Sequence, residues 1–430
     1  MINTEKDTRK IVERAILVGV LDTQSDASEM EEHLLELEDL VNNLGLKVID
    51  KVVVKLKTPS SKYYIGTGKA EEISQMMREF EADCLVFDNN LSPSQQRNWE
   101  ALTKSCVIDR QEVILDIFAD RASTKEAMLQ VALARMEYAL PRLTRAWMHL
   151  SRQRGGNTGA RGEGEKQIEV DRRMVKTSIS TLQKELKEVR LQRDTQRKSR
   201  TRREIPHAAI VGYTNAGKSS LLNKLTGSAV LVEDKLFATL DPTTRKIILP
   251  NKVQLLLTDT VGFIRNLPHT LVEAFKSTLE EAVLADFLVL VLDISNPHVE
   301  DHWETTLSVL KELGAEDKNI ITVFNKIDMQ RDPVTLARIK SLFPGAVYVS
   351  AVTGAGIDEL LSRISRFVSD RIRLLHLKLP PTRHDLAAMI HANGNILESE
   401  YDDEGNLLLT INIAQGYEKK LADYIVDRNP

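Results

Sequence analysis

The 430-residue chain lacks the features that mark secreted, membrane-spanning and fibrous proteins. Its two cysteines, Cys84 and Cys106, are too few for a disulfide framework, and neither has the spacing of a metal ligand. The first ten residues are polar and charged, without the apolar stretch of a signal peptide. The sequence has no run of about 18 apolar residues that could span a membrane. We therefore expect a soluble, cytoplasmic protein.

An overall excess of one charge is also missing. The 58 Lys and Arg residues are nearly balanced by 62 Asp and Glu residues, so any surface for nucleic acid must be local. Hydrophobic residues make up 42% and charged residues 28% of the chain, which is typical of folded globular proteins. At about 150 residues per domain, the length predicts roughly three domains. We expect the protein to be a monomer.

Residues 1–122 are predicted to form an N-terminal α/β domain. Its short apolar runs are Ala15–Val20, Lys47–Val54, Cys84–Phe87 and Val107–Asp109. Helical patterns occupy the intervals at Glu31–Leu44, Ala70–Phe80 and Ser92–Leu102. Strands that alternate with helices indicate a parallel sheet with crossover helices.

Residues 123–204 show a different pattern, with apolar residues spaced alternately three and four apart. One stripe runs from Leu129 to Leu150 and a second from Ile168 to Arg193, as in a coiled coil. Five glycines between them, within Ser151–Gly164, would interrupt a helix. We therefore expect a long antiparallel helical hairpin with a tip loop at 151–164, and Pro141 could kink its first arm.

The hairpin also concentrates positive charge. Arg142–Arg203 contains 18 Lys and Arg residues against 7 Asp and Glu residues. Arginines at the tip, among them Arg152, Arg154 and Arg161, could neutralise phosphates, while the glycines permit close approach. The low aromatic content, 5%, argues against base stacking and favours backbone and shape contacts to RNA.

Residues 205–372 begin with a phosphate-binding motif. The apolar run Ala208–Val211 leads into Gly212-Tyr-Thr-Asn-Ala-Gly-Lys-Ser219 and then a helical segment, which is the strand–loop–helix context that this motif requires. Lys218 would supply charge to the phosphates and the Ser219 hydroxyl would bind Mg²⁺. The residues predicted to contact nucleotide here are Gly212, Tyr213, Thr214, Asn215, Ala216, Gly217, Lys218, Ser219 and Ser220.

Three further motifs follow in order, each after an apolar strand. The contact residues predicted from them are Asp259, Thr260, Val261, Gly262, Asn325, Lys326, Asp328, Ser350, Ala351 and Val352. Gly262 could present its N–H to the terminal phosphate. The Asp328 carboxylate could accept two hydrogen bonds from guanine, a donor pair that adenine lacks. The Ala351 N–H could reach guanine O6. The set resembles that of the translation-factor-related P-loop GTPases. Residues 205–372 are therefore expected to form a GTPase domain (the G domain) with GTP, GDP and Mg²⁺ as ligands.

The expected first switch, Phe237–Thr244, contains the candidate Mg²⁺ ligand Thr239, with Thr243 as second choice. We expect Lys218, Thr239 and Gly262 to act in catalysis. Ras-like enzymes carry a water-orienting Gln directly after the DxxG glycine, but here Phe263 takes that place, so unaided hydrolysis should be slow. Asn215 resembles the K⁺ ligand of potassium-stimulated GTPases, although it could equally be a turn-forming residue.

The last segment, 378–430, is predicted to be a small α+β domain. Its expected elements are a helix at His384–His391, strands at Leu397–Tyr401 and Asn406–Ile413, and a helix at Tyr417–Ile425. With 5 Lys and Arg residues against 9 Asp and Glu residues it is mildly acidic, and its role cannot be deduced from its composition.

Residues Gly159–Arg173, with the sequence GARGEGEKQIEVDRR, resemble the GxGExxLExDRR signature of the HflX family of ribosome-associated GTPases. The resemblance extends over the whole chain. It implies binding to the large ribosomal subunit, through 23S rRNA and proteins, and splitting of stalled 70S ribosomes in a stress response. It also implies that the tip loop 151–164 reaches toward the peptidyl-transferase centre.

The family resemblance further implies ATP binding by the N-terminal domain. The candidate loop is Gly66-Thr-Gly-Lys69, which could equally be an ordinary turn at a helix start because the full motif is missing. Two other functions stay open: an RNA-remodelling NTPase that uses ATP in the N-terminal domain, and a GTP-gated ribosome-binding scaffold without splitting activity.

Overall fold

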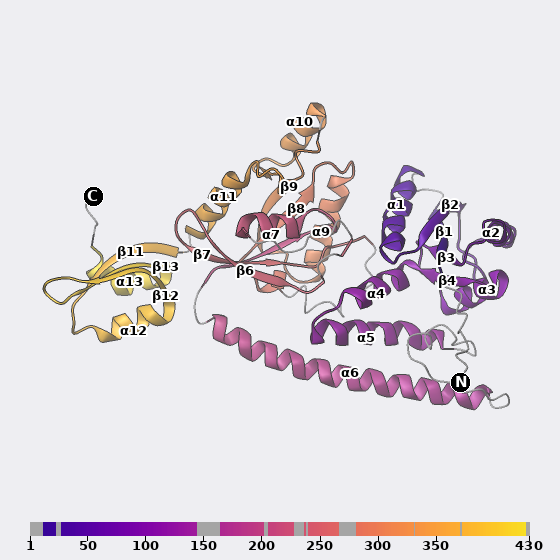
Figure 1. Cartoon of the computed structure of the whole chain (residues 1–430), viewed down its shortest axis with the longest axis horizontal. Coiled ribbons are helices and arrows are strands. Elements are labelled where there is room, and N and C mark those ends of the chain that lie inside the picture. The colour runs from indigo at the N-terminus through magenta and orange to yellow at the C-terminus, as the bar shows by residue number, and fades with distance from the viewer. Residues whose placement is uncertain are drawn as a thin grey trace, which may run out of the picture. The chain divides into compact units, whose positions relative to one another are not determined.

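The computed structural model describes residues 12–22, 27–143, 164–201, 205–227, 236–237, 240–265, 281–330, 332–369 and 372–426 (Figure 1). The tip loop up to residue 163, Thr239 and the part beyond residue 265 of the expected second switch, Thr260–Leu267, lie outside these ranges. The chain divides into two compact units, which we describe separately. One comprises Met1–Glu185 with Lys235–Ala238 and Leu267–Ala274, and the other comprises the rest.

The N-terminal domain contains a four-stranded parallel sheet in the order β2-β1-β3-β4. Its strands are β1 (Arg14–Asp22), β2 (Lys47–Leu56), β3 (Cys84–Phe87) and β4 (Cys106–Asp109), and its helices are α1 (Ala27–Asn43), α2 (Thr67–Glu79), α3 (Pro93–Thr103) and α4 (Arg110–Arg121). The parallel α/β prediction is confirmed. Both cysteines are free, on adjacent strands.

Helix α4 was not predicted from the sequence. Asp109 both ends β4 and caps α4, since its side chain accepts a hydrogen bond from Glu112 N at 3.0 Å. A single residue with both roles leaves no Gly, Pro or Ser-rich turn between the elements, so the usual boundary signal is missing.

The two arms expected of the hairpin appear as separate helices. Helix α5 spans Lys125–Ala139 and passes into a short 3₁₀ turn at Leu140–Arg142, because Pro141 cannot donate the next helical hydrogen bond. Arg142 fixes this end: it donates to Leu91 O at 2.9 Å and lies 3.5 Å from the centre of the Tyr138 ring. The first arm was expected to continue to Leu150, but 144–163 are outside the described residues.

The second helix, α6, spans Gly164–Thr201 (Figure 1). Gly164, expected at the end of the loop, is its first residue. Val175 and Leu186 of the predicted apolar stripe are buried, whereas Val170 and Met174 are exposed. The antiparallel pairing of the two arms stays a prediction.

The G domain contains a six-stranded sheet in the order β10-β9-β8-β5-β7-β6. Its strands are β5 (His207–Gly212), β6 (Thr243–Ile248), β7 (Gln254–Asp259), β8 (Phe287–Asp293), β9 (Asn319–Asn325) and β10 (Val347–Tyr348). Its helices are α7 (Lys218–Thr226), α9 (Val299–Glu312), α10 (Pro333–Leu342) and α11 (Ile357–Ser369). This arrangement places the carboxyl ends of the parallel strands, and with them the sequence motifs, at one edge of the sheet.

Strand β6 is an addition to the predicted elements. It pairs antiparallel with β7, so Thr243 of the expected first switch stands opposite Asp259. The Thr244 and Thr258 hydroxyls are 2.8 Å apart. Within β6 Ile247 is buried, whereas Thr244, Arg245, Lys246 and Ile248 are exposed, as suits a strand at the edge of the sheet. Its high content of charged and Thr residues concealed it in the sequence.

The C-terminal domain has a three-stranded antiparallel sheet in the order β11-β13-β12. Its elements are β11 (Ile372–Leu379), α12 (His384–Asn393), β12 (Gly394–Tyr401), β13 (Leu407–Ala414), a 3₁₀ turn (Gln415–Tyr417), α13 (Glu418–Leu421) and a second 3₁₀ turn (Ala422–Tyr424). The helix predicted at Tyr417–Ile425 is confirmed in part: Glu418–Leu421 is α-helical, and 3₁₀ turns stand on either side of it. Gly416 in the first of these turns favours a turn over a continuous α-helix.

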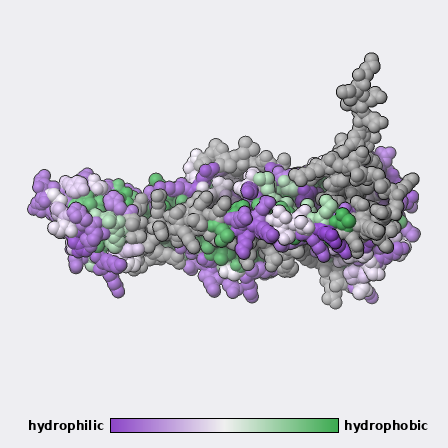
Figure 2. All heavy atoms as spheres, turned by 90° about the horizontal axis from the view of Figure 1, so that it is seen from below, coloured by the Kyte–Doolittle hydropathy of each residue, from purple (hydrophilic) through white to green (hydrophobic). Residues whose placement is uncertain are grey.

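The predicted domain boundary at residue 378 is wrong, because it falls inside β11. Leu375, Leu377 and Leu379 of this strand belong to the domain's own core with Leu409 and Ile411. The two prolines at 380 and 381 follow directly after the end of this strand. No helix among the described residues is long and apolar enough to cross a membrane. On the face shown in Figure 2, most coloured residues are hydrophilic, with small hydrophobic patches between them.

Candidate functional site

The loop between β5 and α7 has the backbone shape of a phosphate-binding loop. Asn215 and Gly217 have left-handed φ angles of 58° and 85°. A Cβ on Gly212 would lie 2.1 Å from the Val291 carbonyl oxygen, and one on Gly217 would lie 2.3 Å from Asn325 Nδ2. Both positions therefore require glycine. Left-handed residues in such a loop turn successive N–H groups toward one concave side, where an anion can bind.

Lys218 brings a buried cation into this loop. Its side chain is 6% exposed and its Nζ donates to the Tyr213 carbonyl oxygen at 2.8 Å. Burial lowers the pKa of Lys218 to about 8, against the opposing effect of the Asp259 carboxylate. An ammonium group held in so little water is well suited to bind the phosphates of a nucleotide.

Ser219 and Asp259 bring two polar oxygen groups together beside Lys218. The Ser219 hydroxyl donates to Asp259 Oδ2 at 2.6 Å, where β7 ends. A hydroxyl and a carboxylate in this position are the hard donors that Mg²⁺ prefers. These residues fit a magnesium ion, which Ser219 would hold and Asp259 would help to orient.

The start of the second switch lies directly against the phosphate loop. Thr214 N donates to Phe263 O at 2.8 Å, and Phe263 N donates to Gly212 O at 3.0 Å. A Cβ on Gly262 would come within 2.8 Å of both Lys218 Nζ and the Thr214 Cα. Gly262 therefore has room for its backbone alone. Phe263 is 1% exposed, so the residue at the usual glutamine position is buried and apolar.

Thr260 and Val261, the other motif residues before Gly262, are also buried. The Thr260 hydroxyl donates to Ile210 O at 2.7 Å, and Val261 is 4% exposed. The hydroxyl of Tyr213 accepts a hydrogen bond from Arg265 N at 2.9 Å. The phosphate loop and the second switch are thus joined through backbone and side chain alike.

Asn325 connects three of the predicted motifs. It is 2% exposed, its Nδ2 donates to Ala216 O at 3.0 Å, and its Oδ1 accepts from Ala351 N at 3.0 Å. The expectation that the Ala351 N–H is available for guanine O6 therefore needs correction, because in this structure Asn325 occupies it. Asp328 is exposed at the same edge, Ser350 is buried and Val352 is 79% exposed.

Asp293 is a site residue that the sequence motifs did not reveal. Its carboxylate lies 2.8 Å from the Lys326 ammonium group, and Lys326 has a left-handed φ of 64°. Asp293 is the last residue of β8, so an acidic residue at a strand end was the available signal. The ion pair fixes the position of the Lys326 ammonium group.

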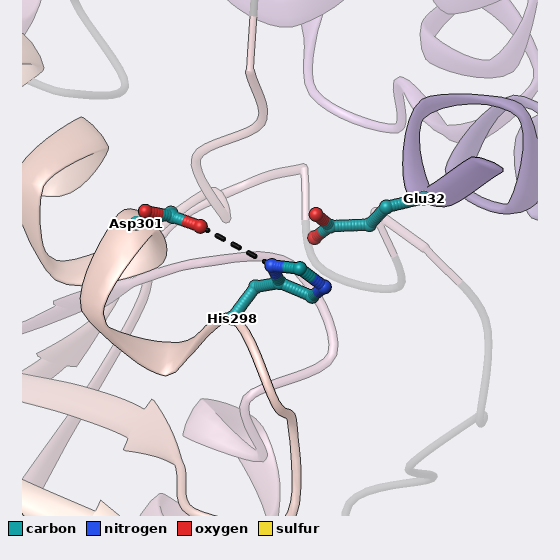
Figure 3. A group of neighbouring side chains, drawn as sticks. All are labelled: Glu32, His298 and Asp301. Atoms are coloured by element: carbon teal, nitrogen blue, oxygen red, sulfur yellow. Dashed lines mark hydrogen bonds and ion pairs between the residues drawn. The ribbon is translucent and has the colours of Figure 1, made fainter. Parts of the chain in front are cut away.

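Helix α9 contributes contacts that no motif indicated. The His302 ring stacks on Tyr213 of the phosphate loop, with ring centres 3.7 Å apart and planes at 4°. At the start of the helix, His298 Nδ1 lies 3.3 Å from Asp301 Oδ2 (Figure 3). The stacking of His302 on Tyr213 joins segments that are far apart in the sequence, so it leaves no local pattern there.

Within the first switch, Phe237–Thr244, the structure describes Phe237 and the residues from Leu240 onward, and it also describes the preceding Leu236. Phe237 has a left-handed φ of 56°, and its ring lies edge-on to Phe118 with centres 4.6 Å apart. Asn43 Nδ2 donates to Leu236 O at 2.7 Å. These contacts lie within the compact unit that contains the N-terminal domain. Thr239 lies outside the described residues.

The candidate ATP loop of the N-terminal domain has a different geometry. Gly66 precedes α2 with a φ of −65°, and a Cβ on Gly66 or Gly68 would meet nothing within 4 Å. Lys69 is paired with Glu72 one turn along the helix at 2.5 Å. The turn has neither the left-handed glycines nor the enclosed lysine of the loop in the G domain.

Family models match most of the chain in succession. Residues 31–119 match the "GTP-binding GTPase N-terminal" model, 121–200 the "GTP-binding GTPase Middle Region", 207–326 the "50S ribosome-binding GTPase" and 339–425 the "HflX C-terminal domain". A GTPase HflX of Akkermansia muciniphila is 52% identical over 434 residues, which cover 98% of this chain and 99% of that protein. The chain belongs to the HflX family of GTPases.

GTPase HflX of Escherichia coli K12 is 41% identical over 400 residues, covering 93% of both chains. A solved structure of a GTP-binding protein from the archaeon Sulfolobus solfataricus with GDP is 27% identical with a TM-score of 0.43, covering 83% of this chain and 99% of that one. The resemblance seen at Gly159–Arg173 and the prediction of a P-loop GTPase are confirmed. This HflX-family protein is a ribosome-binding GTPase that binds GTP and GDP and hydrolyses GTP.

Proposed function

We propose that this HflX-family GTPase binds the large ribosomal subunit and separates stalled or idle 70S ribosomes, with the loop 151–164 directed at the peptidyl-transferase centre. The observation that carries the proposal is the basic helical arm joined directly to the nucleotide site. Helix α6 ends at Thr201, and β5, which leads into the phosphate loop, begins at His207. The charge excess of Arg142–Arg203 fits ribosomal RNA, whose phosphates attract Lys and Arg.

In the proposed cycle, Lys218 and the N–H groups of the phosphate loop hold the phosphates of GTP. Mg²⁺, held by Ser219 and by Thr239 of the first switch, would neutralise charge on the phosphates. Gly262 turns its N–H toward the terminal phosphate, so both switches become ordered in the GTP state. Loss of that phosphate releases them. Asn215 is the proposed K⁺ ligand, which turnover in KCl and in NaCl would test.

The proposed arm function predicts a clear division between two assays. Deleting Ser151–Gly164 should leave GDP affinity near normal but abolish ribosome splitting, because the deletion removes the tip and spares the pocket. Light scattering of 70S ribosomes measures splitting. A matched variant with lysines at Arg152, Arg154 and Arg161 keeps the charge and should retain most activity. Normal splitting by the deletion variant would refute the role of the tip.

The guanine assignment rests on Asp328, whose carboxylate accepts two hydrogen bonds from the base. Asp328→Asn should shift preference from GTP toward xanthosine triphosphate, since xanthine offers an oxygen where guanine has its amino group. Competition binding with both nucleotides measures the shift. Retained preference for GTP would show that another group reads the base.

Two competing functions predict different experimental results. ATP turnover that survives Lys218→Ala would indicate an RNA-remodelling ATPase in the N-terminal domain, which the geometry of Gly66–Lys69 does not favour. Ribosome binding without stimulated GTP hydrolysis would indicate a GTP-gated scaffold.

A further inference from the structure

The nucleotide site of this GTPase lacks one side chain that related phosphate-loop enzymes use in hydrolysis. In Ras-like enzymes a glutamine after the DxxG glycine orients the attacking water. Here Phe263 has that place, is 1% exposed, and is held by two backbone hydrogen bonds to Gly212 and Thr214. A phenyl ring cannot hold a water molecule by an ordinary hydrogen bond. Either another side chain of the pocket holds the attacking water, or the reaction proceeds without a side chain that orients it.

Thr214 lies where such a group is needed. The point at which a Cβ on Gly262 would sit is 2.8 Å from Thr214 Cγ2, from Thr214 Cα and from Lys218 Nζ. Gly262 and Lys218 are the two residues that address the terminal phosphate from opposite loops. The Thr214 atoms nearest to this point are the methyl carbon and Cα, not the hydroxyl oxygen. The hydroxyl and Cγ2 are bonded to the same carbon atom, so a rotation about the Cα–Cβ bond brings the hydroxyl to this point of convergence.

The hydroxyl of Thr214 also lacks a protein partner. Thr214 is 7% exposed, and its Oγ1 is buried without a hydrogen bond to any residue that the structure describes. A buried hydroxyl in this state costs free energy unless a ligand satisfies it. Thr260, a few residues before Phe263, shows the ordinary alternative: its hydroxyl is fully buried and donates to Ile210 O at 2.7 Å.

We propose that the Thr214 hydroxyl is a catalytic group that holds the water attacking the terminal phosphoryl group of GTP. It accepts a hydrogen bond from that water and aims the water oxygen at phosphorus. The new oxygen–phosphorus bond forms as the bond to GDP breaks, and the proton of the water passes to a phosphate oxygen. The hydroxyl itself is unchanged, since an alcohol is too weak a base to take the proton. Its contribution is orientation.

The test compares Thr214→Val, which replaces the hydroxyl with a methyl group of similar shape, with Thr214→Ser, which keeps the hydroxyl. Single-turnover GTP hydrolysis is measured on the full chain, together with affinities for GDP and a non-hydrolysable GTP analogue. We expect Thr214→Val to lower the rate at least about tenfold, up to the 10²–10³-fold found for other single hydrogen-bonding groups, at nearly unchanged affinities. Thr214→Ser should stay close to wild type.

Thr226→Val is the matched control, because its hydroxyl donates to Leu222 O at 2.8 Å at the far end of α7. It should hydrolyse GTP at the normal rate. A normal rate in Thr214→Val would overturn the proposal. So would a loss of affinity for the GTP analogue that accounts for the slower reaction, since the hydroxyl would then bind the phosphate and not the water. Should Thr214→Val fail to bind GDP, Thr214→Ala replaces it, and equal rates for the Ala and Ser variants would refute the proposal.

Discussion

The N-terminal domain and the G domain are both parallel α/β sheets with charged residues at the carboxyl ends of their strands, yet they use these residues differently. In the N-terminal domain, Asp88 follows β3 and Asp109 ends β4. In the G domain, Asp259 ends β7 and Asp293 ends β8. Ligands in open α/β sheets bind at this edge, so position alone marks both as candidates.

In the N-terminal domain the charges neutralise one another. The buried Arg110 guanidinium lies 2.8 Å from Asp88 and 2.7 Å from Glu36. Asp109 accepts hydrogen bonds from Leu91 N and from the Tyr138 hydroxyl. The loop around Lys218 instead surrounds a buried cation with turned backbone N–H groups. The comparison indicates two uses of a strand end. Where a buried charge is available to a ligand, the strand end is a binding site. Where partners within the protein already neutralise the charge, the strand end has a structural role.

Arg110→Ala tests the structural side of the comparison and should have the largest effect. It leaves two carboxylates without their buried partner, a change that typically costs about 3–5 kcal/mol. Urea unfolding followed by fluorescence of the buried Trp99 measures the loss. Arg338→Ala, which removes an exposed pair with Glu300, should cost about 0–1 kcal/mol. Equal losses in the two variants would contradict the structural role of Arg110.

Lys218→Ala against Lys69→Ala tests the functional side. Removing Lys218 takes away the buried cation of the phosphate site and should lower GTP turnover by about 10²–10³-fold. Lys69 is paired with Glu72 on the surface of α2, so its loss should leave turnover unchanged. GTP hydrolysis by the two purified variants measures the difference. A large effect of Lys69→Ala would show that the N-terminal turn also serves nucleotide chemistry.

Glu112→Gln tests whether the Glu112 carboxyl of the N-terminal domain stays protonated near neutral pH. Burial, followed by the nearby Asp109 and Asp116 charges, raises the pKa of Glu112 to about 8. A raised carboxyl pKa adds stability that is complete below the unfolded pKa of 4.5 and is lost as the pH rises through about 8. The glutamine variant cannot ionise, so its unfolding free energy should fall less than that of wild type between pH 5 and pH 8.5. Parallel curves for the two proteins would show that Glu112 ionises normally.

Proton uptake by Lys218 is the smallest expected effect. Its pKa of about 8 in the free protein should rise when phosphates bind, so GDP binding between pH 8 and 9 should take up protons. Calorimetry in buffers of different ionisation heat measures this. Lys218→Arg stays charged throughout, and subtracting its uptake removes the contribution of guanine itself. The same uptake in both proteins would mean that Lys218 is already protonated.

The sequence was sufficient for those parts of the fold that have a local signal. Strands such as β3 and β8 are unbroken apolar runs, and the phosphate loop has a fixed spacing around Gly212 and Lys218. The parallel sheets and the GTPase class followed from these, and the family followed from the resemblance at Gly159–Arg173. Strand β6 and helix α4 were missed because one is polar at a sheet edge and the other shares a residue with a strand.

Contacts between distant segments account for what could not be predicted in the site. Asn325 was expected as a nucleotide contact, and its two hydrogen bonds, one of which occupies Ala351 N, depend on how three loops pack. The pairing of Asp293 with Lys326 and the stacking of His302 on Tyr213 join residues that are far apart in sequence. Only the packed structure shows that the Thr214 hydroxyl has no hydrogen-bond partner among the described residues.

GTP turnover with and without purified large ribosomal subunits tests the central claim most directly. The account predicts slow hydrolysis by the protein alone and at least about tenfold faster hydrolysis when the subunits are added. Wild-type protein that hydrolyses GTP at one rate in both conditions would contradict the ribosome-dependent switch.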